Sequence, residues 1–403
     1  MNPILPLKSF VPDGEPHVMP DGRLYLYGSY DRIDVMDYCS KVYHVFSTDD
    51  MENWIDHGES YRLDGNFPLY APDAAHKDGK YYLYYCTGGE DGEYTAISDT
   101  PYGPFTDAQP VEHATHTGID PSVFVDDDGQ AYYFWGQFSL MGAKLKADMR
   151  SIDPDSIRYN ILTEETHGFH EGSSIRKRNG IYYLIYCDVT RGRATCLSYA
   201  MAKNPLGPYT KGGIIIDNIY CDPQTWNNHG SIEEYKGQWY IFYHRSTRNS
   251  GCNRRACCEK IEFDENGLIK EVEMTTQGAS APIDAFRLLP ACRACRMKGD
   301  AYIATDDVMD EKLTACHGSD RWPGWAEYKY LDFGTGAKKV RITARGKGTI
   351  HVCQEERSPY GEIHVDSEDF ITYEADGNWQ GGVHVMRLFF RGKDMEVRSI
   401  IFE

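Results

Sequence analysis

Four carboxylic acids and one histidine stand at matching positions in five similar segments of this sequence. Each lies in or just before a short run of strand-forming residues, and they are Asp13, Asp73, Asp120, Glu171 and His229. If these side chains converge, the carboxylates cannot all stay ionised, so at least one pKa must rise. Glycosidic hydrolysis needs such a pair: one carboxyl protonates the leaving oxygen, and one carboxylate activates water or attacks the sugar. A third carboxylate can set the pKa of the acid.

A repeat runs through the same segments. Five stretches share a Gly or Asp turn followed by a short aromatic strand, marked by Tyr25, Tyr82, Tyr133, Tyr183 and Tyr240. The markers lie about 50 to 57 residues apart, which is typical of one four-stranded antiparallel sheet per repeat. Five such sheets predict a closed five-bladed β-propeller, whose inner strands bring the polar residues to one end of the central channel. The alternative is five unrelated turn residues, because Asp favours turns.

The composition indicates a β-rich protein and excludes two kinds of partner. A chain of 403 residues with 13% aromatic residues predicts two domains built from many short strands. The net charge of −19 argues against nucleic acids and anionic membranes, since both bind basic surfaces. No segment approaches the apolar length that crosses a bilayer. The first residues, MNPILPLKSFVPDGEP, lack the pattern of a secretory signal, so a cytoplasmic location is expected; a secreted protein whose signal had been removed is the alternative.

Neither cysteine spacing nor glycine-rich motifs point to a cofactor. The 12 cysteines are scattered, and one C-x-x-C occurs in the group Cys252, Cys257, Cys258, Cys292 and Cys295. A lone C-x-x-C lacks the paired spacing of a zinc site, so buried free thiols are favoured over zinc. The sequence has no G-x-G-x-x-G after a strand, no Walker loop and no G-x-S-x-G elbow. We therefore expect a reaction that requires no cofactor.

Several motifs resemble glycoside hydrolase family 43, in the order of the predicted blades. They are VPDGEPHV, YAPDAAHKDGKYYLYY, GIDPSVFVDDDG, HEGSSIRKRNGIYYLIY and NHGSIEEYKGQWYIFYHRS. The resemblance implies a five-bladed propeller that acts on a glycoside or plant-type oligosaccharide as an inverting exo-glycosidase of the α-L-arabinofuranosidase or β-xylosidase type. It implies Asp13 as general base, Asp120 as pKa modulator and Glu171 as general acid. Galactan- and galactofuranose-cleaving members of the family remain alternatives.

A second acidic residue, two positions away, is the alternative general base. The family commonly has Asp-Pro where this chain has Asp13, Gly14 and Glu15. Alignment on His17 and Val18 favours Asp13, whereas a slip of two residues would select Glu15, and Glu15 is expected to line the pocket in either case.

Substrate binding is expected of a further set of residues, namely Tyr70, Asp73, Trp135, Trp226 and Arg245. Tyr70 replaces a family Trp and can still stack on a sugar face. Asp73 binds the sugar or caps a turn, and the other three line the subsite or belong to blade packing and surface charge. His229 matches a family histidine that in many members sits beside a bound calcium ion and its waters. Calcium prefers oxygen ligands, so a structural histidine is the alternative to this possible channel calcium.

A second domain is expected where the repeat ends. The predicted domains are residues 1–290, the catalytic propeller, and residues 296–403, a smaller jelly-roll-like β-sandwich with alternating strands such as KKVRITARG. The second region resembles a carbohydrate-binding module of family 6, but one strand of that pattern is missing near Trp379. A structural role is therefore favoured: bracing the propeller, or lending a loop such as residues 318–320 to the active-site rim.

Two non-catalytic functions are alternatives to an enzyme: a lectin-like propeller and a scaffold. A lectin-like propeller that binds sugar without cleaving it would have lost at least one of Asp13, Asp120 and Glu171, yet all three are present. A pure scaffold would have apolar or filled channel ends instead of a ring of acids. The carboxylates therefore favour catalysis.

Overall fold

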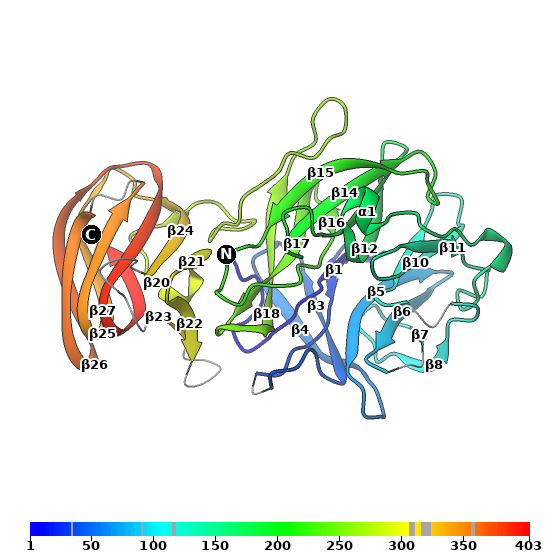
Figure 1. Ribbon diagram of the computed structural model, residues 1–403, viewed down its shortest axis with the longest axis horizontal. Coiled ribbons are helices and arrows are strands. Elements are labelled where there is room, and N and C mark those ends of the chain that lie inside the picture. Colours follow the sequence, from blue (N-terminus) through cyan, green and yellow to red (C-terminus); the bar gives the residue numbers. More distant parts are fainter. Residues whose placement is uncertain (34, 90–91, 115–117, 306–310, 316–323, 356–358) are drawn as a thin grey trace.

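The computed structural model describes residues 1–33, 35–89, 92–114, 118–305, 311–315, 324–355 and 359–403. Figure 1 shows a larger body that runs from blue to green, beside a smaller one in yellow, orange and red. Helix in the described residues is limited to α1 (Glu164–His167) and two short 3₁₀ turns, η1 (Pro154–Ser156) and η2 (Ala291–Arg293). The predicted all-β class is confirmed. Within these residues, no helix combines the length and apolar character needed to traverse a bilayer.

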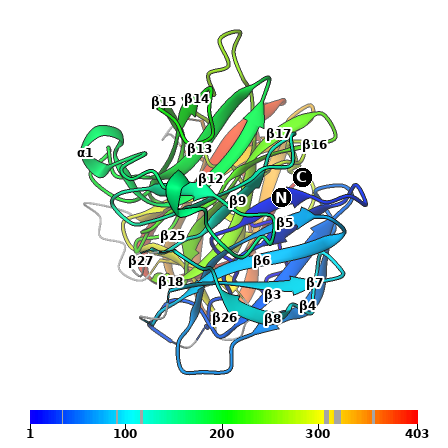
Figure 2. The same cartoon turned by 90° about the vertical axis from the view of Figure 1, so that its right-hand side faces the viewer.

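The larger body consists of five antiparallel sheets that follow one another along the chain. They are β1 (Glu15–Val18), β2 (Leu24–Tyr27), β3 (Val42–Thr48) and β4 (Trp54–Arg62); β5 (Leu69–Lys77), β6 (Lys80–Thr87), β7 (Glu93–Ser98) and β8 (Thr106–Pro110); β9 (Ser122–Val125), β10 (Ala131–Trp135) and β11 (Met141–Lys144); β12 (Phe169–Arg178), β13 (Ile181–Asp188), β14 (Cys196–Ala202) and β15 (Thr210–Asp217); and β16 (Ile232–Tyr235), β17 (Gln238–Thr247) and β18 (Ser250–Ile261). Figure 2 views this body after a 90° turn, with β5, β9 and β12 near the middle. The predicted five-bladed propeller is confirmed.

Each blade begins with an inner strand that pairs antiparallel with the aromatic strand of the repeat. The marker tyrosines oppose inner-strand residues in the pairs His17 and Tyr25, Ala75 and Tyr82, Val123 and Tyr133, Arg176 and Tyr183, and Glu233 and Tyr240. Most of these rings are buried, which gives such short sheets the apolar area they need to pack on their neighbours. The inner strands therefore start at equivalent places and can present polar residues to one site.

Two blades differ from the expected four strands. Among the described residues, the third and fifth sheets have three strands each. After β11 the chain forms only isolated bridges, such as Gly142 to Arg158, because a 3₁₀ turn interrupts it. Beside β18 runs the N-terminal segment, where Ile4 N–H donates to Ala256 O at 3.0 Å. A parallel bridge from Gly14 to Gly230 joins the first and last blades and closes the ring.

In the part of the chain that the structure describes, the C-terminal strands form one nine-stranded, curled sheet over its own core. They are β19 (Ile283–Asp284), β20 (Leu289–Pro290), β21 (Arg296–Lys298), β22 (Ala301–Thr305), β23 (Glu311–Ala315), β24 (Gly324–Asp332), β25 (Ala337–Gln354), β26 (Pro359–Trp379) and β27 (Val383–Phe402). This β-rich domain agrees with the expected fold class. Because β19 pairs with β24 and β20 with β27, the chain joins this sheet from Ile283 onward. The boundary at residues 290 and 296 and the resemblance to a carbohydrate-binding module stay predictions.

The described cysteines are all free, and all but Cys252 are buried. No cysteine belongs to a cluster of three metal-ligating side chains in the described part of the chain. This arrangement agrees with the expectation of buried thiols.

Candidate active site

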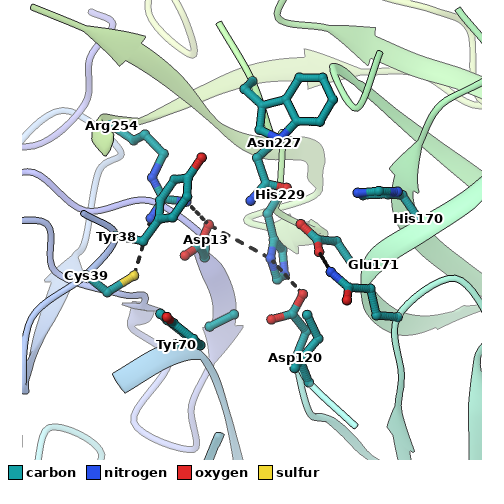
Figure 3. Close-up of a pocket in the computed structure, with 14 residues that line it drawn as sticks. Asp13, Tyr38, Cys39, Tyr70, Asp120, His170, Glu171, Asn227, His229 and Arg254 are labelled. Carbon is teal, nitrogen blue, oxygen red and sulfur yellow. Dashed lines mark hydrogen bonds and ion pairs between the residues drawn. The ribbon is translucent and has the colours of Figure 1, made fainter. Parts of the chain in front are cut away.

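A pocket of about 300 Å³ lies where the inner strands begin. Figure 3 shows that it gathers side chains from all five blades around Asp13, Asp120, Glu171 and His229. The full set of lining residues is Asp13, Tyr38, Cys39, Tyr70, Ala71, Ile119, Asp120, Gln137, His170, Glu171, Trp226, Asn227, His229 and Arg254. The predicted catalytic carboxylates, which lie up to 158 residues apart in sequence, therefore share one small site.

Unusual backbone conformations aim the acidic side chains into this pocket. Asp13 and Asp120 both have φ of 56°, just before β1 and β9. This left-handed conformation is costly for most residues, but Asp tolerates it because its short side chain can bond locally. Glu171 lies at an irregularity of β12, followed by Gly172 with φ of 66°. A Cβ at Gly172 would lie 3.0 Å from the ring of His229, so glycine allows this close approach.

Asp13 is held as an ionised carboxylate. Arg254 Nη1 donates to its Oδ1 at 2.9 Å, and Ser29 Oγ donates to its Oδ2 at 2.6 Å. Burial alone would raise the pKa of Asp13, but the Arg254 guanidinium and the neighbouring His244 and His229 hold that pKa well below its usual range. An ionised carboxylate only accepts protons, which is the state a general base requires.

Asp120 and Glu171 form a coupled pair of carboxyls. Burial, the charge of Glu171 and then that of Asp13 raise the pKa of Asp120 well above its usual range. The Asp120 carboxyl therefore holds its proton to higher pH than an ordinary aspartate, and the charge of Glu171 contributes to this effect. Gln137 Nε2 donates to Glu171 Oε2 at 2.8 Å and fixes the orientation of that carboxyl. The pocket therefore contains one ionised carboxylate, Asp13, and one carboxyl with a raised pKa, Asp120.

His229 stands between the two aspartates. Its Nδ1 lies 3.9 Å from Asp13 Oδ1 and 3.8 Å from Asp120 Oδ2. Burial lowers the pKa of His229, which favours the neutral ring. The carboxylates within its reach are those of the acid–base set, and no cluster of three ligating side chains forms around His229 in the described residues. These residues do not supply the oxygen cage that calcium prefers, and a calcium ion here stays a prediction.

Tyr70 and Trp226 line the pocket as expected, and Trp226 is 39% exposed with its ring 5.6 Å from the Arg193 guanidinium. Four other expected substrate-binding residues are not among the lining residues. Trp135 is fully buried in blade packing beside Tyr133, and Arg245 is buried in an ion pair with Glu259 at 3.3 Å.

Glu15 and Asp73 lie on the inner strands away from the pocket lining. Glu15 pairs with Arg176 at 2.6 Å, and Asp73 accepts from Val123 N–H at 2.7 Å. Side chains on a strand alternate between faces and advance along it, so Glu15, two residues beyond Asp13, enters a deeper layer. Both residues thus lie outside the pocket lining, and their contact with substrate stays a prediction.

Arg254 is the main residue that sequence reasoning missed. Asp31 holds its guanidinium from the far side, with Oδ2 and Oδ1 accepting from Nε at 3.0 Å and Nη2 at 2.9 Å. Tyr38 covers it with a ring centroid 4.9 Å away. The run NRRA contains two consecutive arginines, and nothing in the letters separates Arg254 from Arg255. The available signal was an arginine inside a strand of small residues. Such a strand is expected to be buried, and a charge is rarely buried unless it is paired.

Comparison with known proteins finds the same relationship in sequence and in fold. Residues 1–269 match glycosyl hydrolases family 43. A xylosidase/arabinosidase of Thermoclostridium stercorarium is 32% identical, over 97% of this chain and 96% of its own length. A solved family 43 β-xylosidase/α-arabinofuranosidase from a compost metagenome is 30% identical, with a TM-score of 0.58 over 67% of this chain and 97% of that one.

The fold is shared along the whole chain with a solved arabinoxylan arabinofuranohydrolase of Bacillus subtilis. That structure covers 100% of this chain and 97% of its own, with a TM-score of 0.59 and 22% identity. The likeness therefore includes the C-terminal domain as well as the propeller.

Proposed function

This chain belongs to glycosyl hydrolase family 43, and from that premise we propose that it releases terminal arabinofuranosyl or xylosyl residues from oligosaccharides. It is a glycoside hydrolase of an inverting family, and hydrolysis in this family requires no cofactor. The observation that carries the proposal is that one pocket brings together an ionised Asp13, an Asp120 carboxyl with a raised pKa, and Glu171.

Asp13 and Glu171 divide the two proton transfers. Asp13 accepts a proton from a water molecule as the water oxygen bonds to the anomeric carbon. Glu171 gives a proton to the glycosidic oxygen as the carbon–oxygen bond breaks, so that the products are a free alcohol group and a sugar of inverted configuration. Asp120 tunes the proton affinity of the acid because the two carboxyls are coupled.

The size and lining of the pocket support action at a chain end. A space of about 300 Å³ is at the low end for small-ligand sites, so it suits a terminal sugar better than an internal stretch of polymer. Tyr70 and Trp226 offer flat faces on which a sugar ring can stack. The relative from T. stercorarium is named a xylosidase/arabinosidase, which supports these two sugars for the present chain.

Two alternatives to the proposed activity are another sugar specificity and a lectin-like role without catalysis. A galactan- or galactofuranose-cleaving specificity would use the same carboxylates with another sugar. A lectin-like role is disfavoured because Asp13 is ionised and Gln137 orients Glu171, features that sugar binding alone does not need.

A panel of aryl glycosides tests the proposal. The substrates are the α-L-arabinofuranoside, the β-D-xyloside, the β-D-galactoside and the β-D-galactofuranoside, assayed with the whole chain at equal concentrations. We expect the highest kcat/KM for the arabinofuranoside or the xyloside. Preference for a galactose-based substrate would replace the proposed sugar, and a sugar that binds but stays intact for days would overturn the enzyme assignment.

A further inference from the structure

A second polar layer lies in the propeller channel, one step along the inner strands from the catalytic pocket. Glu15, His17 and Asp73 place their ligating atoms within 4.8 Å of one another, and His17 Nε2 lies 2.6 Å from Asp73 Oδ1. Two buried carboxylates and an imidazole at this spacing resemble a cation site. The catalytic roles proposed above do not use this layer.

The side chain of Arg176 reaches into this layer from β12 and is itself buried. Its hydrogen bonds are Nε to Glu233 Oε2 at 2.9 Å, Nη1 to Ser174 Oγ at 3.2 Å, Nη1 to Ile175 O at 2.8 Å, Nη2 to Glu15 Oε1 at 2.6 Å and Nη2 to Pro16 O at 2.5 Å. A guanidinium has five N–H donors, so every one of them has an acceptor. A fully satisfied arginine in this position leaves no donor free for an incoming ligand.

The partners of Arg176 come from three blades. Glu15 and Pro16 belong to β1 of the first blade, Ser174 and Ile175 to β12 of the fourth, and Glu233 to β16 of the fifth. The first and fifth blades are the two that must meet to close the ring. Arg176 therefore ties the closure together from inside the channel.

The charges around Arg176 are those expected around a bound cation. Burial opposes its charge, but Glu15, Glu233 and then Asp73 raise the pKa of Arg176 further above its ordinary value. Burial and then the Arg176 charge lower the pKa of His17 to about 4, so this imidazole is neutral near pH 7. The positive charge in the layer is thus carried by arginine.

We propose that the Arg176 guanidinium is the resident cation of the propeller channel, holding the Glu15–His17–Asp73 cluster and the closing blades together in place of a metal ion. The channel layer of this enzyme is consequently complete without calcium. This inference rests on the fold and on the Arg176 contacts, and it holds whichever sugar the enzyme cleaves.

Thermal unfolding with and without calcium tests the proposal. Wild-type protein is expected to show the same Tm in EDTA and in about 5 mM CaCl₂, a concentration ample for a site of ordinary affinity. Arg176→Met removes the charge and leaves Glu15, Asp73 and Glu233 without their partner, so its Tm in EDTA should fall by about 10 °C. Calcium should then raise the Tm of this variant by several degrees, because the carboxylates left without their arginine can ligate it.

Arg178→Met is the matched control, since Arg178 is on the same strand but lies outside the channel, 4.2 Å over the Phe263 ring. It should lose little stability and show no calcium response. If Arg176→Met does not fold, Arg176→Lys keeps the charge with fewer donors and should fold with a lower Tm that calcium does not change. A wild-type Tm that falls in EDTA and recovers with calcium would overturn the proposal, as would an Arg176→Met variant that loses no stability.

Discussion

Asp13 and Glu15 show how neighbouring acidic residues acquire different chemistry. They are two positions apart, yet Asp13 meets Arg254 at the pocket and Glu15 meets Arg176 in the channel layer. Burial raises the pKa of Glu15, whereas Arg254 and two histidines lower that of Asp13. The sequence could not separate these residues, because the difference comes from arginines that arrive from other blades.

The coupled carboxyls predict a specific change in the pH dependence of activity. An ionised Asp120 favours the protonated state of its neighbour, because like charges repel. Replacing Asp120 with Asn removes the negative charge beside the acid, so the basic limb of kcat/KM should move down by about one unit or more. A pH–rate profile of the Asp120→Asn variant measures the shift. An unmoved limb, or one moved to higher pH, would remove Asp120 from the role of modulator.

The pH–rate profile of the wild-type enzyme tests the ionisation of Asp13. Its pKa is held below the ordinary value, so the base is ionised at every pH above about 4. The acidic limb of wild-type kcat/KM should therefore lie below that pH.

At the scale of the strand, glycine placement controls the geometry of the acid. Gly172 follows Glu171 on β12, and an added Cβ would meet the His229 ring at 3.0 Å with φ at 66°. Gly172→Ala should lower stability by about 1–2 kcal/mol through the left-handed backbone and lower kcat by about tenfold or more through displaced neighbours.

Gly180 supplies the control on the same hairpin. Its φ is 74°, and nothing lies within 4 Å of an added Cβ. Gly180→Ala should cost similar stability and leave kcat unchanged. Equal kcat in both variants, measured on folded protein, would show that the contact with His229 does not matter for catalysis.

The repeating elements were predictable because each blade carries the same two signals. A polar residue before a short strand and an aromatic strand after a turn recur in every blade, and both are local patterns. The irregular third blade, the burial of Trp135 and the Arg245–Glu259 pair were not predictable, since they depend on contacts between segments distant in sequence. An exposed aromatic residue and a buried one have the same one-letter code, so the sequence does not distinguish them.

At the scale of the molecule, the two domains are joined near the catalytic base. Glu311 of the C-terminal domain forms a buried ion pair with Arg255, whose guanidinium lies 4.2 Å over the Phe10 ring. The carbonyl of Phe10 accepts from Asp31 N–H at 2.9 Å, and Asp31 holds Arg254. This chain of contacts supports the expected bracing role of the C-terminal domain.

The interface predicts unequal costs for two similar substitutions. Glu311→Gln leaves Arg255 buried without its acidic partner and should reduce the free energy of unfolding by about 3–5 kcal/mol. Glu273→Gln breaks another interdomain pair, with Lys329 at 3.1 Å, but Glu273 is 61% exposed and the expected loss is about 0–1 kcal/mol. Urea unfolding of both variants makes the comparison, and equal losses would refute a special role for the Glu311 pair.

The organisation into a propeller and a second β domain followed from where the repeat ends, which is visible in the sequence. The contacts between the domains did not, because Glu311 and Arg255 carry no local signal of pairing. The predicted rim loop at residues 318–320 lies outside the described residues.

The central claim is that Asp13 and Glu171 divide base and acid catalysis, and the measurement closest to it compares two variants on two substrates. Glu171→Gln should lose about 10²–10⁴-fold in kcat/KM on an unactivated oligosaccharide but far less on an aryl glycoside with a good leaving group, which needs little protonation. Asp13→Asn should lose about 10²–10⁴-fold on both, because water activation is required for each. Equal losses by Glu171→Gln on the two substrates, or turnover retained by Asp13→Asn, would contradict the account.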